Sequence, residues 1–325
     1  MLKIIIDFLQ FIFTNAPLLT SVAIFTLLSI WLAKSIKKNS KIYYFILAIP
    51  FFLVAIPTIF RWCGIPLPIN FVGVPVLGVI LRDYIHMGTL GHPLLIIIMY
   101  MGALDPKIPF VKKLMSIRKE LSIIVGFPVL THSLVRVANN FTTPLQFFTD
   151  KETYLANNPV ASELGAGISS FSLVLGIVML VIFLPLWITS FDSVRKRMGA
   201  AKWKKLQKWS YVLYATLFIH AAGIAIGGMM NPRGGGASPR PAIEVSAQAT
   251  AERPQGEQAT RPAENREQNT QAAHRGRVMP KSFGDFQVPR KNIQYIHLVS
   301  LVLIYCSYLY LRVRKARKSS KTSYK

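Results

Sequence analysis

The sequence predicts an all-α membrane protein with about seven transmembrane helices. The chain has 325 residues, is 52% hydrophobic and has a mean hydropathy of +0.38. It also carries 38 Lys+Arg against 14 Asp+Glu, a formal net charge of +24. The apolar residues form long blocks and the basic residues lie between them, which is typical of a polytopic membrane protein. This pattern excludes an ordinary cytosolic domain and, despite the basic isoelectric point, argues against nucleic acid as a partner.

Seven apolar blocks follow one another along the chain. They cover residues 15–33, 42–60, 89–104, 121–138, 168–190, 209–229 and 294–311. A helix needs about 20 residues to cross a hydrocarbon core of about 30 Å, so the third block is marginal in length. The stretch 71–81 before it is apolar but short and interrupted by Gly and Pro, which favours a re-entrant or interfacial segment.

The basic residues predict how the helices are oriented. Four connectors, residues 34–41, 104–120, 191–208 and 312–325, together hold 23 Lys and Arg. The alternating segments 1–14, 61–88 and 139–167 hold one, two and one. By the positive-inside rule the N-terminus lies outside and the C-terminus in the cytoplasm of a multi-pass protein of the plasma or inner membrane. Membrane lipids, anionic ones at the basic face, are therefore expected partners.

Residues 231–290 break the apolar pattern. They are rich in Ala, Pro, Gln, Glu, Gly and Arg and contain no aromatic residue before Phe283. Such a composition cannot bury enough surface to offset chain entropy, so we expect a disordered segment outside the cell, between the last two spans.

Two histidines lie at the same depth in two different spans. His132 follows Glu120 by 12 residues, and His220 follows Lys208 by 12 residues. At about 1.5 Å per residue, both lie about 18 Å from the basic side. Imidazoles at one depth on two helices can face each other and bind the iron of haem b from opposite sides. The alternative is two separate histidines, each hydrogen-bonded within the bundle.

Four further residues are weaker candidates. Arg136 lies one helical turn outward of His132 and suits the carboxylates of a haem, although an arginine that reaches interfacial water explains it equally well. His86, His92 and His297 all fall near the outer boundary. They could form a quinone site, a metal site or an alternative haem ligand, or simply make interfacial hydrogen bonds.

Several motifs resemble the ferric reductase-like transmembrane domain family, nearest its bacterial branch with the haem-binding subunit of the methionine sulfoxide reductase system. That branch has Pro-Leu-x-x-Thr-Ser at the end of one span, a basic loop with a Trp, and two histidines 13 residues apart. The matching positions are Pro185, Leu186, Thr189, Ser190, Trp203, Leu206, Tyr211 and His220. The stretch RKELSIIVGFPVLTH resembles another span of the family and matches it at Arg118 and His132, and DYIHMGTLGHPLL resembles a diverged helix start.

The resemblance implies a six-helix ferric reductase-like bundle plus one extra N-terminal helix. The predicted domains are an extra helix and loop (1–41), a haem-binding transmembrane domain (42–229), a disordered insert (230–293), and a last helix with a basic tail (294–325). One position departs from the family: its inner histidine is Gln207 here. Because an amide is a poor iron ligand, we expect one haem b, on the outer side, held by His132 and His220.

The resemblance implies an electron-transfer subunit of an oxidoreductase. The tail after Leu311 is too short for a flavin and NAD(P)H domain of its own, so the electron donor should be a quinol or a separate flavoprotein. A bound quinone or FMN is compatible with this expectation, and the acceptor would be an extracytoplasmic protein or ferric iron. The alternatives are a polytopic transporter or a membrane scaffold that binds no haem. A transporter is disfavoured because no apolar block contains a central Asp or Glu.

Overall fold

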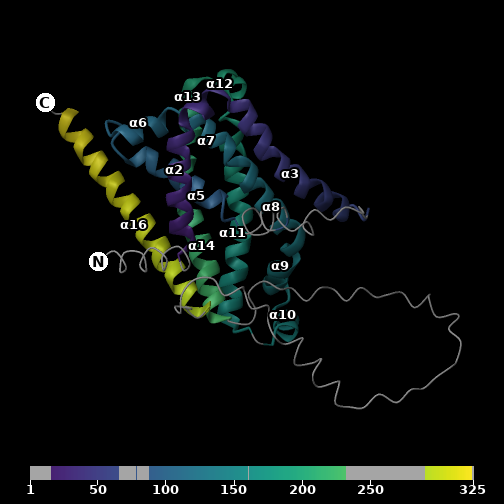
Figure 1. The fold of residues 1–325 in the computed structure, drawn as a ribbon. Coiled ribbons are helices and arrows are strands. Elements are labelled where there is room, and N and C mark those ends of the chain that lie inside the picture. Colours follow the sequence, from purple (N-terminus) through teal and green to yellow (C-terminus); the bar gives the residue numbers. More distant parts are fainter. Residues whose placement is uncertain (1–15, 66–77, 79–87, 160, 232–289, 324–325) are drawn as a thin grey trace, which may run out of the picture. The chain divides into compact units, whose positions relative to one another are not determined.

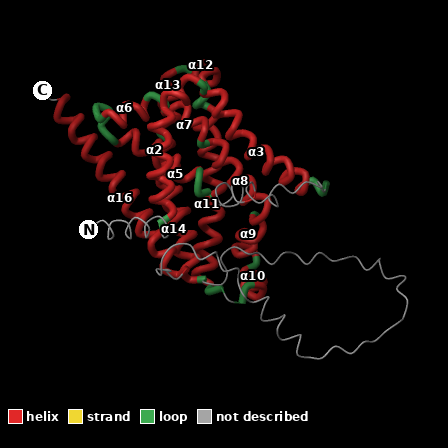
Figure 2. The backbone as a smooth tube through the Cα atoms, in the orientation of Figure 1, coloured by secondary structure: helices red, strands yellow, loops and turns green. Residues whose placement is uncertain are grey.

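The computed structural model describes residues 16–65, 78, 88–159, 161–231 and 290–323. These residues form helices joined by loops and turns, with no strand among them (Figures 1 and 2). Six helices in the described ranges are long and apolar enough to cross a membrane, and one shorter apolar helix accompanies them. The predicted all-α membrane class is therefore confirmed. Residues 232–289 of the predicted disordered insert, the 71–81 stretch apart from Gly78, and His86 lie outside the described residues. The two ends of the predicted insert are described, because α14 ends at Met230 and α16 begins at Arg290.

The helices follow the apolar blocks closely. The long ones are α2 (Pro17–Lys38), α3 (Ser40–Trp62), α11 (Glu163–Ile188), α14 (Trp209–Met230) and α16 (Arg290–Ser323), and α7 (Arg118–Ile124) with α8 (Gly126–Asn140) makes the sixth. The shorter ones are α5 (Gly91–Ala103), α6 (Pro109–Met115), α9 (Thr142–Thr149), α10 (Lys151–Asn157), α12 (Asp192–Met198) and α13 (Ala200–Gln207). The last helix runs past the predicted end of its span at 311, because residues 312–323 contain neither Gly nor Pro and are rich in Arg and Lys.

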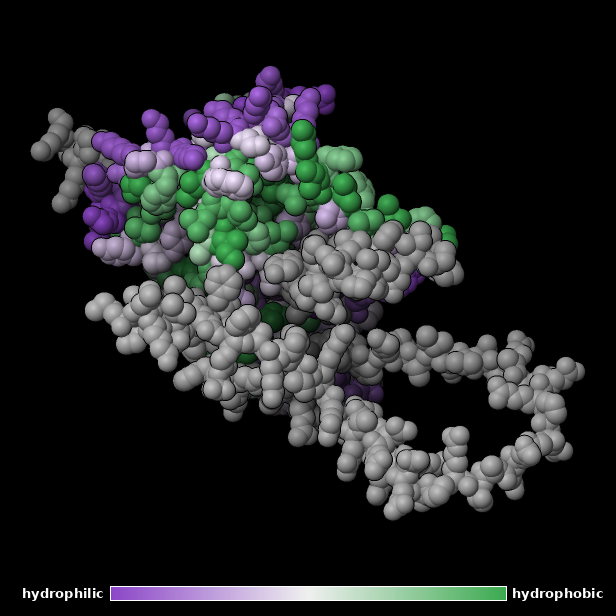
Figure 3. Space-filling model, viewed as in Figure 1, coloured by the Kyte–Doolittle hydropathy of each residue, from purple (hydrophilic) through white to green (hydrophobic). Residues whose placement is uncertain are grey.

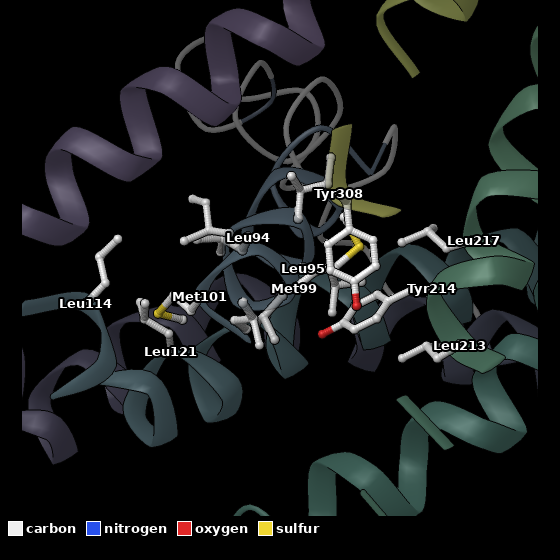
Figure 4. Packing of buried hydrophobic residues seen from close by; sticks show 14 of the residues in the cluster. Leu94, Leu95, Met99, Met101, Leu114, Leu121, Leu213, Tyr214, Leu217 and Tyr308 are labelled. Carbon is white, nitrogen blue, oxygen red and sulfur yellow. The ribbon is translucent and has the colours of Figure 1, made fainter. Parts of the chain in front are cut away.

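The third apolar block forms α5, a short helix in the middle of the bundle. Its 13 residues reach about 20 Å, which is less than a full membrane crossing. Ten of the 13 are buried, and the helix contacts α2, α7, α8 and α16. A helix that is apolar on all sides belongs inside a bundle, which explains why the sequence shows no polar face here. Figure 4 shows this core, with Met101 near Leu114 and Leu121, and Tyr214 beside Tyr308.

The C-terminal end of α5 depends on α16 for its hydrogen bonds. The Arg312 guanidinium donates to the carbonyl oxygen of Gly102 at 3.0 Å. The Lys315 ammonium donates to the carbonyl oxygens of Gly102 and Leu104, each at 3.0 Å. The last carbonyls of a helix have no partner within the helix and carry partial negative charge, so two cations stabilise them well. The basic residues at the end of α16 therefore stabilise the C-terminal end of the short helix.

The fourth predicted span is interrupted between α7 and α8. Pro128 cannot donate a backbone hydrogen bond, and its ring disfavours a continuous helix across the preceding turn. The indole of Trp187 on α11 donates to the carbonyl oxygen of Ile123 at 3.0 Å. A Cβ on Gly126 would lie 1.7 Å from the indole nitrogen, so only glycine leaves room for this ring. The break thus fixes α11 against the junction of α7 and α8.

Helices α11 and α14 pack closely through small residues. A Cβ on Gly223 would lie 2.0 Å from Oγ of Ser172, and one on Gly227 would lie 2.1 Å from Oγ of Ser169. Small residues let helix backbones approach each other, which is how membrane helices associate without a hydrophobic driving force. Asn231 joins the C-terminal end of α14 to the N-terminal end of α11, because its side-chain oxygen accepts a bond of 2.7 Å from the backbone N–H of Ser162.

The surface separates into an apolar band and a basic end. On the face shown in Figure 3, hydrophilic residues gather around α12 and α13, and hydrophobic residues form the band beside them. Large apolar side chains are exposed within this band, including Trp31 at 76% and Phe45 at 68%. Such exposure is expected of side chains that face lipid. The arrangement supports a multi-pass membrane protein.

Candidate functional site

His220 lies on α14 with one ring nitrogen already in use. Its Nδ1–H donates to the carbonyl oxygen of Ser172 on α11 at 2.6 Å. A carbonyl only accepts, so the proton sits on Nδ1 and Nε2 keeps its lone pair. Gly176 provides the space for the ring, because a Cβ there would lie 3.1 Å from Cε1 of His220. The close packing of α11 and α14 therefore fixes both the orientation and the tautomer of this imidazole.

His132 lies on α8, against the turn that precedes α5. A Cβ on Gly88 would lie 3.3 Å from both Cε1 and Nδ1 of His132. Gly88 has a φ of +73°, a conformation that glycine adopts without strain. The carbonyl oxygen of Gly88 also accepts a bond of 3.1 Å from the backbone N–H of His92. One glycine turn thus brings the ring of His132 close to the start of α5, where His92 lies.

His92 lies at the centre of a histidine cluster. Its ring has electrostatic interactions with the rings of His132, His220 and His297. The hydroxyl of Tyr305 on α16 lies 3.4 Å from Nε2 of His92, and the two ring centroids are 6.5 Å apart. Four helices, α5, α8, α14 and α16, therefore each bring one imidazole to the same region. We call these four residues the histidine cluster.

Arg136 contributes a positive charge beside this cluster. It follows His132 by one turn of α8, and its guanidinium has an electrostatic interaction with His220. A cation beside several imidazoles suits a ligand that carries carboxylates, because Arg presents a planar fork of donors to such groups. Arg136 therefore lies beside the histidine cluster, and its binding of a haem carboxylate stays a prediction.

The histidine cluster differs in one respect from the sequence-based expectation. His92 and His297 were weaker candidates than His132 and His220, yet His92 lies near both of these residues and near His297. The sequence held a signal for this, since Gly88 and Gly91 flank the start of α5 and allow close approach. Among the residues that the structure describes, no three His, Cys, Asp or Glu side chains are arranged to hold a bare metal ion.

Gln207 lies at the opposite, basic end of the bundle. Its side-chain amide donates to Oγ1 of Thr189 over a long 3.5 Å, and the neighbouring Trp203 indole donates to the Thr189 carbonyl at 3.1 Å. Gln207 lines a cavity of about 480 Å³ between α5, α7, α11, α13 and α14. No described residue on the wall of this cavity is a histidine or a cysteine.

Residues 86–218 match the family model of the ferric reductase like transmembrane component. These residues are therefore similar to a ferric reductase-like transmembrane region. The matched range includes two residues of the histidine cluster, His92 and His132, and the neighbouring Arg136. It ends two residues before His220. The helices α2, α3 and α16 lie outside the matched range.

Other similarities to known proteins are short. A stretch of 62 residues is 39% identical to an uncharacterized protein of Treponema pallidum (strain Nichols), and it covers 18% of this chain and 17% of that protein. The similarity thus spans less than a fifth of either chain. No solved structure matches the chain. The ferric reductase-like region is accordingly the basis for assigning a class of function.

Proposed function

We propose that this protein is a membrane haem b protein that passes electrons to an acceptor outside the cytoplasm. The ferric reductase-like region supports a membrane oxidoreductase component. In this proposal the donor is a quinol or a separate flavoprotein, and the nearest relationship is to the haem subunit of the bacterial methionine sulfoxide reductase system. The N-terminus lies outside, the C-terminus lies in the cytoplasm, and the membrane is the plasma or inner membrane.

The observation that carries the proposal is the hydrogen bond from Nδ1 of His220 to the carbonyl oxygen of Ser172. An axial haem ligand must offer an unprotonated ring nitrogen, and its other nitrogen is commonly held by a backbone carbonyl. His220 meets both requirements before any ligand binds. Haem iron would supply reversible one-electron exchange at this position.

The second ligand in the proposal is His132. Its ring lies against the Gly88 turn and interacts with His92, which also interacts with His220. Gly88 and Gly176 have no side chain, so the ring of His132 packs against the backbone at Gly88 and the ring of His220 packs against the backbone at Gly176. Arg136 would bind the propionate groups, since it lies beside His132 on α8 and interacts with His220.

Absorbance spectra of the purified protein test the proposal. Protein expressed with ample haem should show a Soret band and, after dithionite, reduced b-type bands. His132→Ala and His220→Ala should each lose most of the bound haem, because an iron with one imidazole is held much more weakly. His297→Ala is the matched control, and it should keep its haem.

Two outcomes would contradict the proposal. A colourless parent protein would exclude haem as the cofactor. Haem retained in His132→Ala but lost in His92→Ala would move the second ligand to α5. Gel filtration and far-UV circular dichroism of each variant separate loss of haem from loss of fold.

A further inference from the structure

We propose that the cavity at the basic end of the bundle is a binding site for one anionic phospholipid. The cavity of about 480 Å³ lies between five helices and is within the size range of ordinary ligand sites. It is separate from the histidine cluster, and the inference does not depend on haem. For clarity we call it the basic-end cavity.

The wall of the basic-end cavity has two chemically different parts. Its floor is apolar and comes from the transmembrane helices, with Leu95, Ile98, Val125, Phe183, Leu186 and Leu213 among its residues. Its rim is basic and consists of Arg118, Lys119, Arg195, Lys204 and Lys208. No Asp or Glu is among the described residues that line it. A ligand that satisfies both parts must be an anion with a large apolar portion.

Two of the five rim cations already have partners. The Lys119 ammonium donates to Oδ2 of Asp192 at 2.9 Å, and this hydrogen bond lowers the pKa of the Asp192 carboxyl. Arg195 lies 3.4 Å from the same carboxylate and also stacks over the Trp203 ring, with its central carbon 5.8 Å from the ring centroid. Both side chains are thereby held in place at the edge of the cavity.

The other three rim cations have no carboxylate within 4.0 Å among the described residues. These are Arg118, Lys204 and Lys208, which come from α7, from α13 and from the residue between α13 and α14. Three cations on separate elements around one opening form a favourable place for a phosphate group. They suit a phosphate at the membrane surface, where each nearby Lys or Arg contributes about 1 kcal/mol to the attraction of anionic lipid.

An anionic phospholipid is the occupant that fits these walls best. Its phosphate would contact Arg118, Lys204 and Lys208, and its acyl chains would lie along the apolar floor and continue into the bilayer. A soluble phosphate would satisfy the rim and leave the floor without a partner. Gln207 also lines the cavity, and its amide is a neutral donor able to bond a phosphate or an ester oxygen.

Native mass spectrometry of the purified full-length protein tests the proposal. The protein is delipidated in detergent and then incubated with vesicles of phosphatidylglycerol, or of phosphatidylcholine with the same acyl chains. We expect one retained phosphatidylglycerol per protein and no comparable adduct with phosphatidylcholine. In Lys204→Gln/Lys208→Gln, the affinity for phosphatidylglycerol should fall by about thirtyfold, as expected for two cations near an anionic surface.

The control keeps the change in charge and alters only its position. Lys202→Gln/Lys205→Gln removes two exposed lysines from α13, the helix that also carries Lys204, and neither lines the cavity. This variant should bind phosphatidylglycerol within about threefold of the parent. Equal losses in both double variants would show general surface attraction and overturn the proposal, as would equal retention of the two lipids.

A third comparison distinguishes lipid from soluble phosphate compounds. Inorganic phosphate or FMN at millimolar concentration is added to the protein that holds phosphatidylglycerol. We expect the lipid to remain bound in both cases. Displacement with one FMN retained per protein would make the cavity a flavin site and would refute the lipid assignment. Displacement by inorganic phosphate would show that the apolar floor contributes nothing.

Discussion

At the residue scale, the hydrogen bonds of single side chains decide what each polar group can do. His220 donates its Nδ1–H to a backbone carbonyl, and its Nε2 is left as the nitrogen with a lone pair. Gln207 occupies the inner position where the sequence resemblance implies a histidine, and its amide bonds only to Thr189 over 3.5 Å. The imidazole of His220 can therefore bind haem iron well, whereas the amide of Gln207 is a poor iron ligand.

The difference at Gln207 leads to a prediction about haem content. The parent protein should bind one haem b, measured as pyridine haemochrome against protein concentration. Gln207→His should raise this ratio above one but not to two, because the new imidazole would be the single histidine among the described residues on the wall of the cavity of about 480 Å³ and would hold a second haem only weakly. Lys202→His, on the same helix but not on the cavity wall, is the control and should leave the ratio unchanged. A parent ratio near two would refute the one-haem prediction.

At the scale of elements, contacts between helices explain why one short helix and one broken helix are stable. Arg312 and Lys315 of α16 bond the last carbonyls of α5, which lies in the bundle without a full membrane crossing. Trp187 of α11 bonds a carbonyl next to the α7–α8 break. In each case a side chain from a distant part of the sequence satisfies backbone groups that the local helix leaves open, as a lipid-embedded protein requires.

The close packing of α11 and α14 gives a prediction for stability. Gly223→Val should lower the free energy of unfolding by about 1–3 kcal/mol, because the new side chain would collide with Ser172 and force the helices apart. The same variant should loosen the bond between His220 and Ser172 and reduce bound haem. Unfolding in mixed micelles with increasing SDS, followed by circular dichroism, measures the change.

The control for this prediction is Gly102→Ala. Apart from its chain neighbours and its own helix backbone, no heavy atom of the described residues lies within 4 Å of a Cβ built on Gly102, so this substitution adds a methyl group without a clash. It should leave the stability unchanged or raise it by up to about 1 kcal/mol, since Ala favours helix over Gly. A Gly223→Val protein as stable as Gly102→Ala would show that the two helices are free to separate at no cost.

At the scale of the whole molecule, the histidine cluster and the basic-end cavity lie in regions of opposite character. The cluster lies at the N-terminal end of α5, and the basic connectors lie towards its C-terminal end, where Arg312 and Lys315 bond. In the proposed orientation, electrons reach the cluster and leave on the extracytoplasmic side, while anionic lipid binds at the cytoplasmic side. Helix α5 reaches from one region to the other, since His92 lies in its first turn and its residues Leu95 and Ile98 line the cavity.

The insert between α14 and α16 gives a prediction at this scale. Deletion of Gly234 to Gly276 should leave the haem content and the thermal unfolding of the protein unchanged, because the composition of that stretch offers no apolar surface to pack. Absorbance at the Soret band per protein is the measurement. A large loss of haem would show that the segment contributes to the fold. A reporter fused at the site of the deletion should be active only outside the cytoplasm, and activity inside would reverse the proposed orientation.

Much of the fold followed from the sequence alone. Apolar blocks predicted the order of the long helices, because in lipid every backbone polar group must be satisfied within a helix or a closed barrel. Six of the seven blocks correspond to candidate membrane spans, and the third forms the shorter helix α5. The alternation of basic connectors separated the two ends of the bundle. His132 and His220 stood out because burying an ionisable side chain inside an apolar block costs free energy unless the side chain has a hydrogen-bond partner or a ligand.

The tertiary structure decided what the sequence left open. The centre of the histidine cluster at His92, the carbonyl partner of His220 and the basic rim around Gln207 all depend on residues far apart in the chain. Periodicity and composition report on the local environment of a residue, and they carry no information on which helices pack together. That pairing depends on whether surfaces fit, as with Gly223 against Ser172 and Gly126 against Trp187, and fit is a property of the assembled bundle.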